Sequence, residues 1–163
     1  MEGRGTGITC HSCGSHWELN TLGQLEAPEG QAQISHIPDY YRWERQQVRQ
    51  EIQEGRYKLD TDVDILIQVD YKAMYRVGQG HLTHDSSGFT LTGCDGRLHY
   101  TQGPKAHHSL YADFYWYEID DVICIGDSEV HYFCFPKNKA PVAKIRLAAE
   151  ELYKLSCQRK PKA

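Results

Sequence analysis

A long strand-like stretch that ends in a single amphipathic helix is the feature that most constrains how this chain folds. Between residues 62 and 69, apolar side chains alternate with mostly polar ones, which is typical of a half-buried β-strand. From Ala140 to Ser156 the apolar positions instead recur at steps of three and four, as on one face of an α-helix. These positions are Val142, Ile145, Ala149 and Leu152. We therefore expect a small barrel or bent sandwich with this helix packed against it.

Turn signals divide the stretch before the helix into about seven short strands. The clearest are Asp95-Gly96 and Gly126-Asp127, each typical of a tight turn. The expected strands are 62–69, 76–84, 88–93, 97–101, 110–116, 121–126 and 129–135. The inward-facing residues of the 110–116 strand are expected to be Leu110, Ala112, Phe114 and Trp116.

This order of elements predicts the fold class and the division of the chain. About seven mostly antiparallel strands followed by one helix is the order of the pleckstrin-homology-like barrel, in which the helix plugs an open end. We expect a mainly β protein with helices, of the α+β class, and lipocalin-like or other small barrels are alternatives. The expected segments are a partial zinc-ribbon-like segment at 1–27, a linker and amphipathic helix at 28–55, the barrel with its helix at 56–157, and a basic tail at 158–163.

The N-terminal segment contains a CxxCG knuckle, residues 10–14. Two thiolates spaced in this way can bind one zinc ion, and the glycine allows the tight turn. A closed structural site needs four ligands, and the chain contains no second CxxC. His11 and His16 are close in sequence, but using both from one short loop would strain the site. We therefore expect Cys10 and Cys13 to form half of a zinc ribbon.

The sequence predicts different structure on the two sides of the knuckle. Residues 1–9 are rich in glycine and are expected to be mobile. Residues 17–19 and 22–25 are expected to form two strands, with Gly23 near their turn.

An amphipathic helix is predicted between Ser35, a candidate N-cap, and Gly55. Arg42, Arg45 and Arg49 form a basic stripe beside its apolar face. The favoured interpretation of this stripe is a solvated flank with local ion pairs. The alternative is a patch that binds phosphate groups or an acidic partner surface.

Charge and composition exclude several kinds of partner. The 163 residues carry a net charge of -4 and are 40% hydrophobic, as in a soluble globular protein. No basic field recruits nucleic acid, and contact with a membrane is expected to be at most weak. No apolar run is long enough to span a bilayer. Six cysteines without an apolar leader segment indicate reduced thiols or metal ligands, and therefore a cytoplasmic location.

The chain contains none of the common catalytic motifs. GxSxG, the P-loop and HExxH are all absent. His81, His84 and Asp85 lie at the end of a predicted hairpin, where polar residues are common. We therefore assign no catalytic residue and no bound cofactor to this chain.

Four stretches together resemble a known family. They are CHSCGSHWELNTLGQLEA (10–27), SHIPDYYRWERQQVRQEI (35–52), GHLTHDSSGFTLTG (80–93) and LAAEELYKL (147–155). They are similar to the region that follows the catalytic domain in bacterial lysophospholipid acyltransferases of the 1-acylglycerol-3-phosphate type, found in gut clostridia. The HxxxxD motif of that catalytic domain is absent here, because His81 precedes Asp85 by only four residues.

The resemblance implies an accessory module in phospholipid biosynthesis. It also implies that an upstream CxxC completes a zinc ribbon with Cys10 and Cys13, so zinc is expected in the intact protein. The expected partner is the acyltransferase domain of the parent chain or another protein. The resemblance also implies a place at the inner face of the membrane through the parent protein. The alternative hypothesis is a free-standing barrel that binds a small, lipid-like ligand. A deep apolar cavity favours this alternative, whereas a filled interior favours the accessory module.

We expect the purified chain to contain no zinc, because two thiolates fill only half of a tetrahedral shell and binding must also displace thiol protons. Metal analysis after purification without added chelator tests this expectation. About one zinc ion per chain would mean that this chain holds a closed site and would overturn the half-ribbon interpretation. About one ion per two chains would indicate that the cysteines of two copies share it.

Overall fold

The structure is a computed structural model that describes residues 2–11, 14–27, 34–70, 73–138 and 140–158. The chain divides into two compact units, residues 1–46 and 47–163. The predicted linker at 28–33 and the basic tail from residue 159 onward lie outside the described residues.

The first unit contains a four-stranded antiparallel sheet in the order β1-β2-β3-β4. Its strands are β1 (Glu2–Arg4), β2 (Gly7–Thr9), β3 (His16–Leu19) and β4 (Leu25–Glu26). The expectation that residues 1–9 are mobile is wrong, because β1 and β2 pair as a hairpin with Gly5 at φ 61° in its turn. The strand expected at 17–19 is present as β3, whereas residues 22–24 of the second expected strand lie in the turn and β4 begins at Leu25. The Asn20 side chain fixes their turn by accepting from the N–H groups of Leu22 and Gln24.

Helix α1 (Ile37–Gln53) is the helix predicted between Ser35 and Gly55, and the division between the units falls inside it. Pro38 lies in its first turn, where a missing N–H costs little. Gly55 follows the last turn with a left-handed φ of 69°. This conformation lets the Arg56 N–H donate to the Glu51 carbonyl oxygen at 2.8 Å, which ends the helix.

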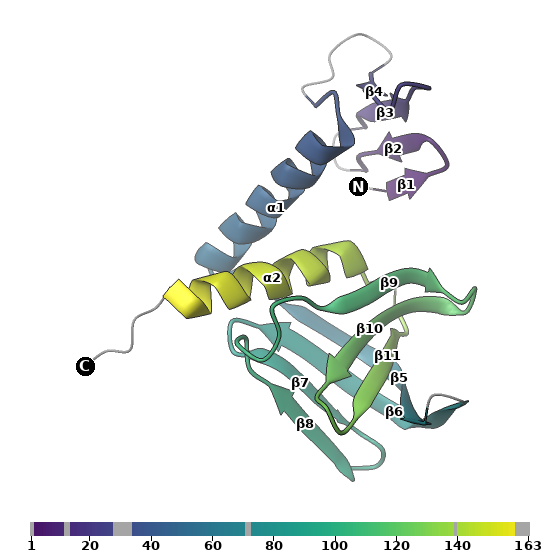
Figure 1. The fold of residues 1–163 in the computed structure, drawn as a ribbon, viewed down its shortest axis with the longest axis vertical. Coiled ribbons are helices and arrows are strands. Elements are labelled where there is room, and N and C mark those ends of the chain that lie inside the picture. Colours follow the sequence, from purple (N-terminus) through teal and green to yellow (C-terminus); the bar gives the residue numbers. More distant parts are fainter. Residues whose placement is uncertain (1, 12–13, 28–33, 71–72, 139, 159–163) are drawn as a thin grey trace. The chain divides into compact units, whose positions relative to one another are not determined.

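The second unit is built on a seven-stranded antiparallel sheet in the order β8-β7-β6-β5-β11-β10-β9 (Figure 1). Its strands are β5 (Leu59–Asp70), β6 (Ala73–Asp85), β7 (Gly88–Gly93), β8 (Leu98–Gln102), β9 (Tyr111–Trp116), β10 (Asp120–Gly126) and β11 (His131–Pro136). The long strand β5 pairs with β6 on one side and with β11 on the other. The predicted α+β class, with mostly strands and two helices, is confirmed.

The sheet does not close into a barrel, contrary to expectation. Its edge strands, β8 and β9, do not pair with each other. Residues 103–110 connect them, and Pro104 in this connection has no N–H for a ladder bond. Side chains link β8 and this connection to the end of β10 instead. Gln102 Oε1 accepts from the Gly126 N–H at 3.0 Å, and His107 Nε2 donates to the Gly126 carbonyl oxygen at 2.7 Å.

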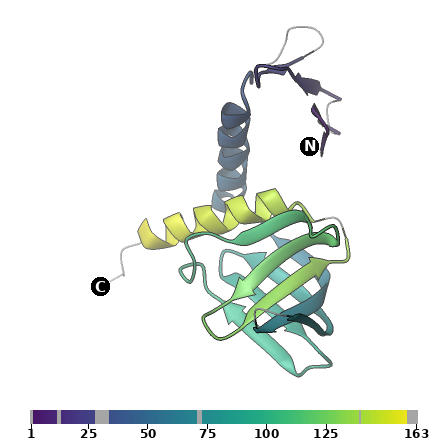
Figure 2. The same ribbon diagram turned by 45° about the vertical axis from the view of Figure 1, so that its right-hand side comes forward.

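Helix α2 (Val142–Gln158) crosses one end of the curled sheet (Figures 1 and 2). As its apolar spacing predicted, Val142 and Ile145 belong to the main core, Ala149 packs against that core and Leu152 is buried. The sheet contributes buried aliphatic side chains from β5, β6, β7 and β10, including Val63, Ile65, Leu82, Leu91, Ile123 and Ile125. Burying one such side chain stabilises the fold by about 1.5–3 kcal/mol, so this layer is the main source of stability in the second unit.

Two opposed glycines allow β6 and β7 to approach closely beneath this core. Gly80 and Gly93 face each other across the two strands. A Cβ atom on Gly80 would lie 2.3 Å from the Thr92 carbonyl oxygen and 2.6 Å from Ile65 Cδ1. Both the close strand approach and the position of Ile65 therefore require glycine here.

The inward-facing residues predicted for β9 are correct only in part. Leu110 and Ala112 face the main core, but Phe114 is 74% exposed. Trp116 packs in a second apolar cluster instead. The prediction fails because β9 is irregular beyond Asp113, so a side-chain period of two no longer applies. Its pairing with β10 shifts register between Asp120 and Val122, and Tyr115 has a left-handed φ of 52°.

A buried carboxylate joins the end of α1 to α2. Glu151 is fully buried, and its two oxygens accept from Arg49 Nε at 2.7 Å and from Lys154 Nζ at 2.8 Å. Lys144 and Glu51 form a second ion pair between the two helices at 2.6 Å. Because a buried charge is tolerated only when it is paired and hydrogen-bonded, these contacts fix the C-terminal part of α1 on α2.

We expect Arg49→Ala to lower the free energy of unfolding by about 3 kcal/mol, because it removes a charged partner from a buried carboxylate. Urea denaturation of the full chain measures this loss. Arg42→Ala is the matched control, since Arg42 pairs with Asp39 one turn away on an exposed surface, and it should cost less than about 1 kcal/mol. Equal effects of the two substitutions would show that the Glu151 contact does not hold the helices together.

Candidate functional site

The predicted zinc ligands lie on the connection between β2 and β3. Cys10 is partly exposed, its N–H donates to the Ser15 carbonyl oxygen, and the Gly14 N–H donates to the Cys10 carbonyl oxygen, both at 2.8 Å. Gly14 has a φ of 74°, so the turn depends on glycine as the sequence indicated. Cys13 lies outside the described residues, and the pairing of the two thiols therefore stays a prediction.

The imidazole groups near Cys10 have other partners. His11 Nε2 lies 2.7 Å from the Glu2 carboxylate, and His16 contacts the Thr9 hydroxyl at 3.0 Å and the Glu18 carboxylate at 3.1 Å. Within the described part of the chain, no three His, Cys, Asp or Glu side chains are grouped so that they could hold a metal ion. The described residues thus supply one thiol of the predicted pair.

Helix α1 places the phenol of Tyr40 within electrostatic reach of Cys10. Burial, followed by the charges of Glu44 and Cys10, raises the pKa of Tyr40 to about 12. Burial also raises the pKa of Glu44.

The arginine stripe is engaged by partners on α1 and α2. Arg42 pairs with Asp39 at 2.9 Å. Arg45 donates to the Tyr41 hydroxyl at 3.0 Å and lies over that ring, with 5.2 Å between its guanidinium carbon and the ring centroid. Arg49 binds the buried Glu151. These contacts favour the interpretation as a flank with local ion pairs, and binding of phosphate groups or an acidic partner stays a prediction.

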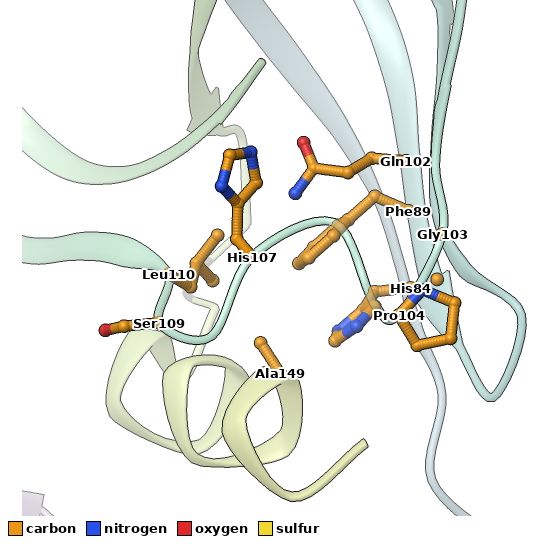
Figure 3. Close-up of a pocket in the computed structure, with 10 residues that line it drawn as sticks. His84, Phe89, Gln102, Gly103, Pro104, His107, Ser109, Leu110 and Ala149 are labelled. Carbon is orange, nitrogen blue, oxygen red and sulfur yellow. The ribbon is translucent and has the colours of Figure 1, made fainter. Parts of the chain in front are cut away.

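The interior of the second unit contains a small hollow between α2, the ends of β7 and β8, and the connection from β8 to β9 (Figure 3). Phe89, Leu110 and Ala149 form its apolar part, and His84, Gln102 and His107 its polar part. Its volume is about 10 Å³, which is room for about one water molecule. Side chains therefore fill this end of the sheet.

His84 is the most perturbed imidazole of the second unit. It is buried, its Nδ1 hydrogen-bonds the Tyr57 hydroxyl at 2.9 Å, and its ring stacks on Phe89 with 3.7 Å between centroids. Burial lowers the pKa of His84 to about 4, against the opposing effect of Asp85. From the sequence, His84 was expected at the end of a hairpin, where polar residues are common. A signal for its burial was present, because His84 is in phase with Leu82 on the inward face of β6.

The three polar residues considered for acid–base chemistry are not brought together. His81 lies on the opposite face of β6 from His84, with Nε2 2.8 Å from Asp60 and Nδ1 3.0 Å from Asp62. The hydrogen bond to Asp62, supported by the charges of both carboxylates, raises the pKa of His81. Asp85 accepts from the backbone and hydroxyl of Ser87. These residues therefore do not form a base with an orienting acid.

The most exposed apolar side chains of the second unit lie at the end of the β9–β10 hairpin. Four residues there, which we name the aromatic tip, are more than half exposed. They are Phe114 at 74%, Tyr115 at 58%, Tyr117 at 78% and Ile119 at 60%. This exposed surface was not predicted from the sequence, because the alternation of inward and outward residues in β9 was expected to continue through Phe114 and to place that side chain in the core.

Comparison of the chain with protein-family models, with curated proteins and with solved structures gives no match. Neither α1 nor α2, the two helices that the structure describes, is long and apolar enough to cross a membrane.

The burial of His84 predicts a loss of stability in weak acid. Because its pKa falls from the ordinary 6.5 to about 4 on folding, the unfolded chain takes up a proton first, so stability decreases as the pH falls through this window. Protonation of His84 lowers the free energy of unfolding by about 3 kcal/mol across this window, and above pH 6.5 it has no effect on stability.

Urea denaturation of the wild type and His84→Gln across this pH range measures the effect. The glutamine variant should lack this part of the pH dependence, whereas groups that both chains share contribute equally to each. His99→Gln, which changes an exposed histidine, is the control and should retain the wild-type slope. Identical slopes for wild type and His84→Gln would show that His84 is not kept neutral by burial.

Proposed function

We propose that this chain is a non-catalytic accessory module of phospholipid-synthesis acyltransferases, with a pleckstrin-homology-like second unit. The element order supports this fold, since seven antiparallel strands are followed by one helix that crosses an end of the sheet. The module positions the enzyme or binds a partner protein. Its expected partner is the acyltransferase domain of the parent chain or another protein, and its expected place is the cytoplasm, at the inner face of the membrane through the parent enzyme.

The observation that carries this proposal is the filled interior of the second unit. A pocket for a lipid-like ligand needs about 300–1,000 Å³, whereas the hollow beside α2 has a volume of about 10 Å³. A wider hollow of about 250 Å³ is lined in part by Tyr57, Lys58 and Asp85, and its charged groups suit an acyl chain poorly. The alternative of a free-standing lipid-binding barrel therefore has less support than a module that acts through its surface.

Zinc has a structural role in this proposal. Cys10 and Cys13 supply two of four thiolates, and the enzyme's chain supplies the others. The knuckle turn at Gly14 supports this assignment. Such a site would join the module to its enzyme without taking part in the reaction.

The proposal is tested with a bacterial lysophospholipid acyltransferase of the type that the sequence resembles, assayed with and without residues 1–163. The chain alone should not acylate a lysophospholipid, and its presence should change the enzyme's apparent KM for the lysophospholipid by at least about fivefold. Ile145→Asp, which places a charge in the core of the second unit, should abolish this change. Acylation by the chain alone, or a KM that is the same in its presence and absence, would refute the proposal.

A further inference from the structure

The aromatic tip is held away from the core by its backbone. Tyr115, Tyr117 and Glu118 all have left-handed φ angles, of 52°, 48° and 60°. For residues other than glycine such angles are unfavourable and persist only where surrounding contacts enforce them. The Tyr115 carbonyl oxygen accepts from the Glu118 N–H at 3.1 Å, and Asp121 Oδ1 accepts from the Tyr115 N–H at 3.1 Å. The exposed side chains therefore project from a defined turn.

Trp116 anchors this turn to the sheet. Its ring stacks on Phe133, with 5.4 Å between centroids, and belongs to the apolar cluster formed by Val122, Phe133 and Phe135. The neighbouring ring of Tyr117 meets Trp116 edge to face at 4.5 Å. One aromatic residue of the turn is thus packed and the others are presented to solvent. This preorganisation lowers the entropy cost of binding a partner.

The charged side chains within the β9–β10 hairpin are all negative. Four carboxylates, Asp113, Glu118, Asp120 and Asp121, alternate with its apolar residues, and residues 111–126 contain no lysine, arginine or histidine. None of these carboxylates forms an ion pair with a residue that the structure describes. Asp113 accepts from the Phe114 N–H and Asp120 from the Asp121 N–H, both nearby backbone groups. Each therefore keeps an oxygen available to a partner.

This combination of groups selects one class of partner. A guanidinium group can stack on the face of a tyrosine or phenylalanine and bind a carboxylate at the same time. Anionic lipid headgroups and nucleic acid phosphates would be repelled by the four carboxylates. A second copy of this chain is also unfavourable, since it carries a net charge of -4 and its stripe arginines are engaged.

We propose that the aromatic tip docks a basic protein segment in which arginines alternate with apolar residues. The apolar residues cover Phe114 and Ile119, and the arginines stack on the tyrosines and pair with the neighbouring carboxylates. The inference rests on the proposed function in that the module acts by binding a protein, and it adds the place of contact and the chemistry of the partner.

Fluorescence anisotropy with the full chain and short labelled peptides tests this docking site. The probe peptide alternates arginine with leucine, and two matched peptides replace each arginine by lysine or by citrulline, which keeps the planar shape without the charge. We expect the arginine peptide to bind about tenfold more tightly than the lysine peptide, because several stacked guanidinium groups each add a few-fold in affinity. The citrulline peptide should not bind measurably.

Variants of the chain locate the binding surface. Phe114→Ser/Tyr117→Ser should weaken binding of the arginine peptide at least about tenfold, and Glu118→Lys by a similar factor. The matched control is Tyr75→Ser, which removes an exposed aromatic residue from β6, separated from β9 by β5, β11 and β10. It should leave binding unchanged. Equal affinity of the tip variants and the wild type would overturn the proposal, as would equal affinity for all three peptides.

Vesicles separate the protein partner from a membrane. We expect no co-sedimentation of the chain with vesicles of phosphatidylcholine and phosphatidylglycerol at ~0.15 M salt. Sedimentation that is lost in Phe114→Ser/Tyr117→Ser would assign the tip to a membrane and overturn the proposal. The peptide experiment and the acyltransferase assay can give different outcomes. If the peptide binds through the aromatic tip but the chain has no effect on the acyltransferase, the docking site is supported and the accessory role is refuted.

Discussion

Strand β5 is the constraint on which the second unit depends, because it alone joins the two halves of the sheet. It pairs with β6, which leads to β7 and β8, and with β11, which leads to β10 and β9. Its inward residues Val63 and Ile65 are fully buried under α2. Residues 131–136 must therefore return to a strand formed more than sixty residues earlier. Such non-local pairing is specified by the inward apolar face, since a one-residue slip would turn that face to solvent.

The open edge of the sheet explains why the interior is filled. A closed barrel can enclose a ligand cavity, but here Gln102 of β8 and His107 of the β8–β9 connection bond to Gly126 at the end of β10. These side chains, together with α2 and the stacked rings of His84 and Phe89, occupy the volume that a ligand would need. The same contacts that stabilise an unclosed sheet thus favour a function at the surface.

Local patterns in the sequence predicted most of the elements, and long-range contacts account for the errors. The alternation of residues 62–69 and the spacing of Val142, Ile145 and Ala149 each reflect one element against one core, so β5 and α2 were predicted correctly. Closure of the barrel depends on how two distant edges of the sheet meet, which no local pattern in the sequence indicates.

The burial of Glu151 depends on Arg49, 102 residues away, and the exposure of Phe114 depends on the left-handed turn that follows it. Neither could be inferred from neighbouring residues. For the predicted zinc ligands, the sequence identified the turn at Gly14, whereas the rest of the ligand set depends on residues beyond this knuckle.

The carboxylates of the β9–β10 turn give the aromatic tip both solubility and selectivity. Exposed aromatic residues without charge would bind apolar surfaces of many kinds. With four carboxylates interleaved, the same rings are unfavourable neighbours for an anionic bilayer, for nucleic acid and for another copy of this acidic chain. Repulsion of the wrong partners is as effective a source of specificity as attraction of the right one. A module that works beside a membrane-associated enzyme would gain from such repulsion, because it keeps the tip available for a basic protein segment while the lipid surface is close.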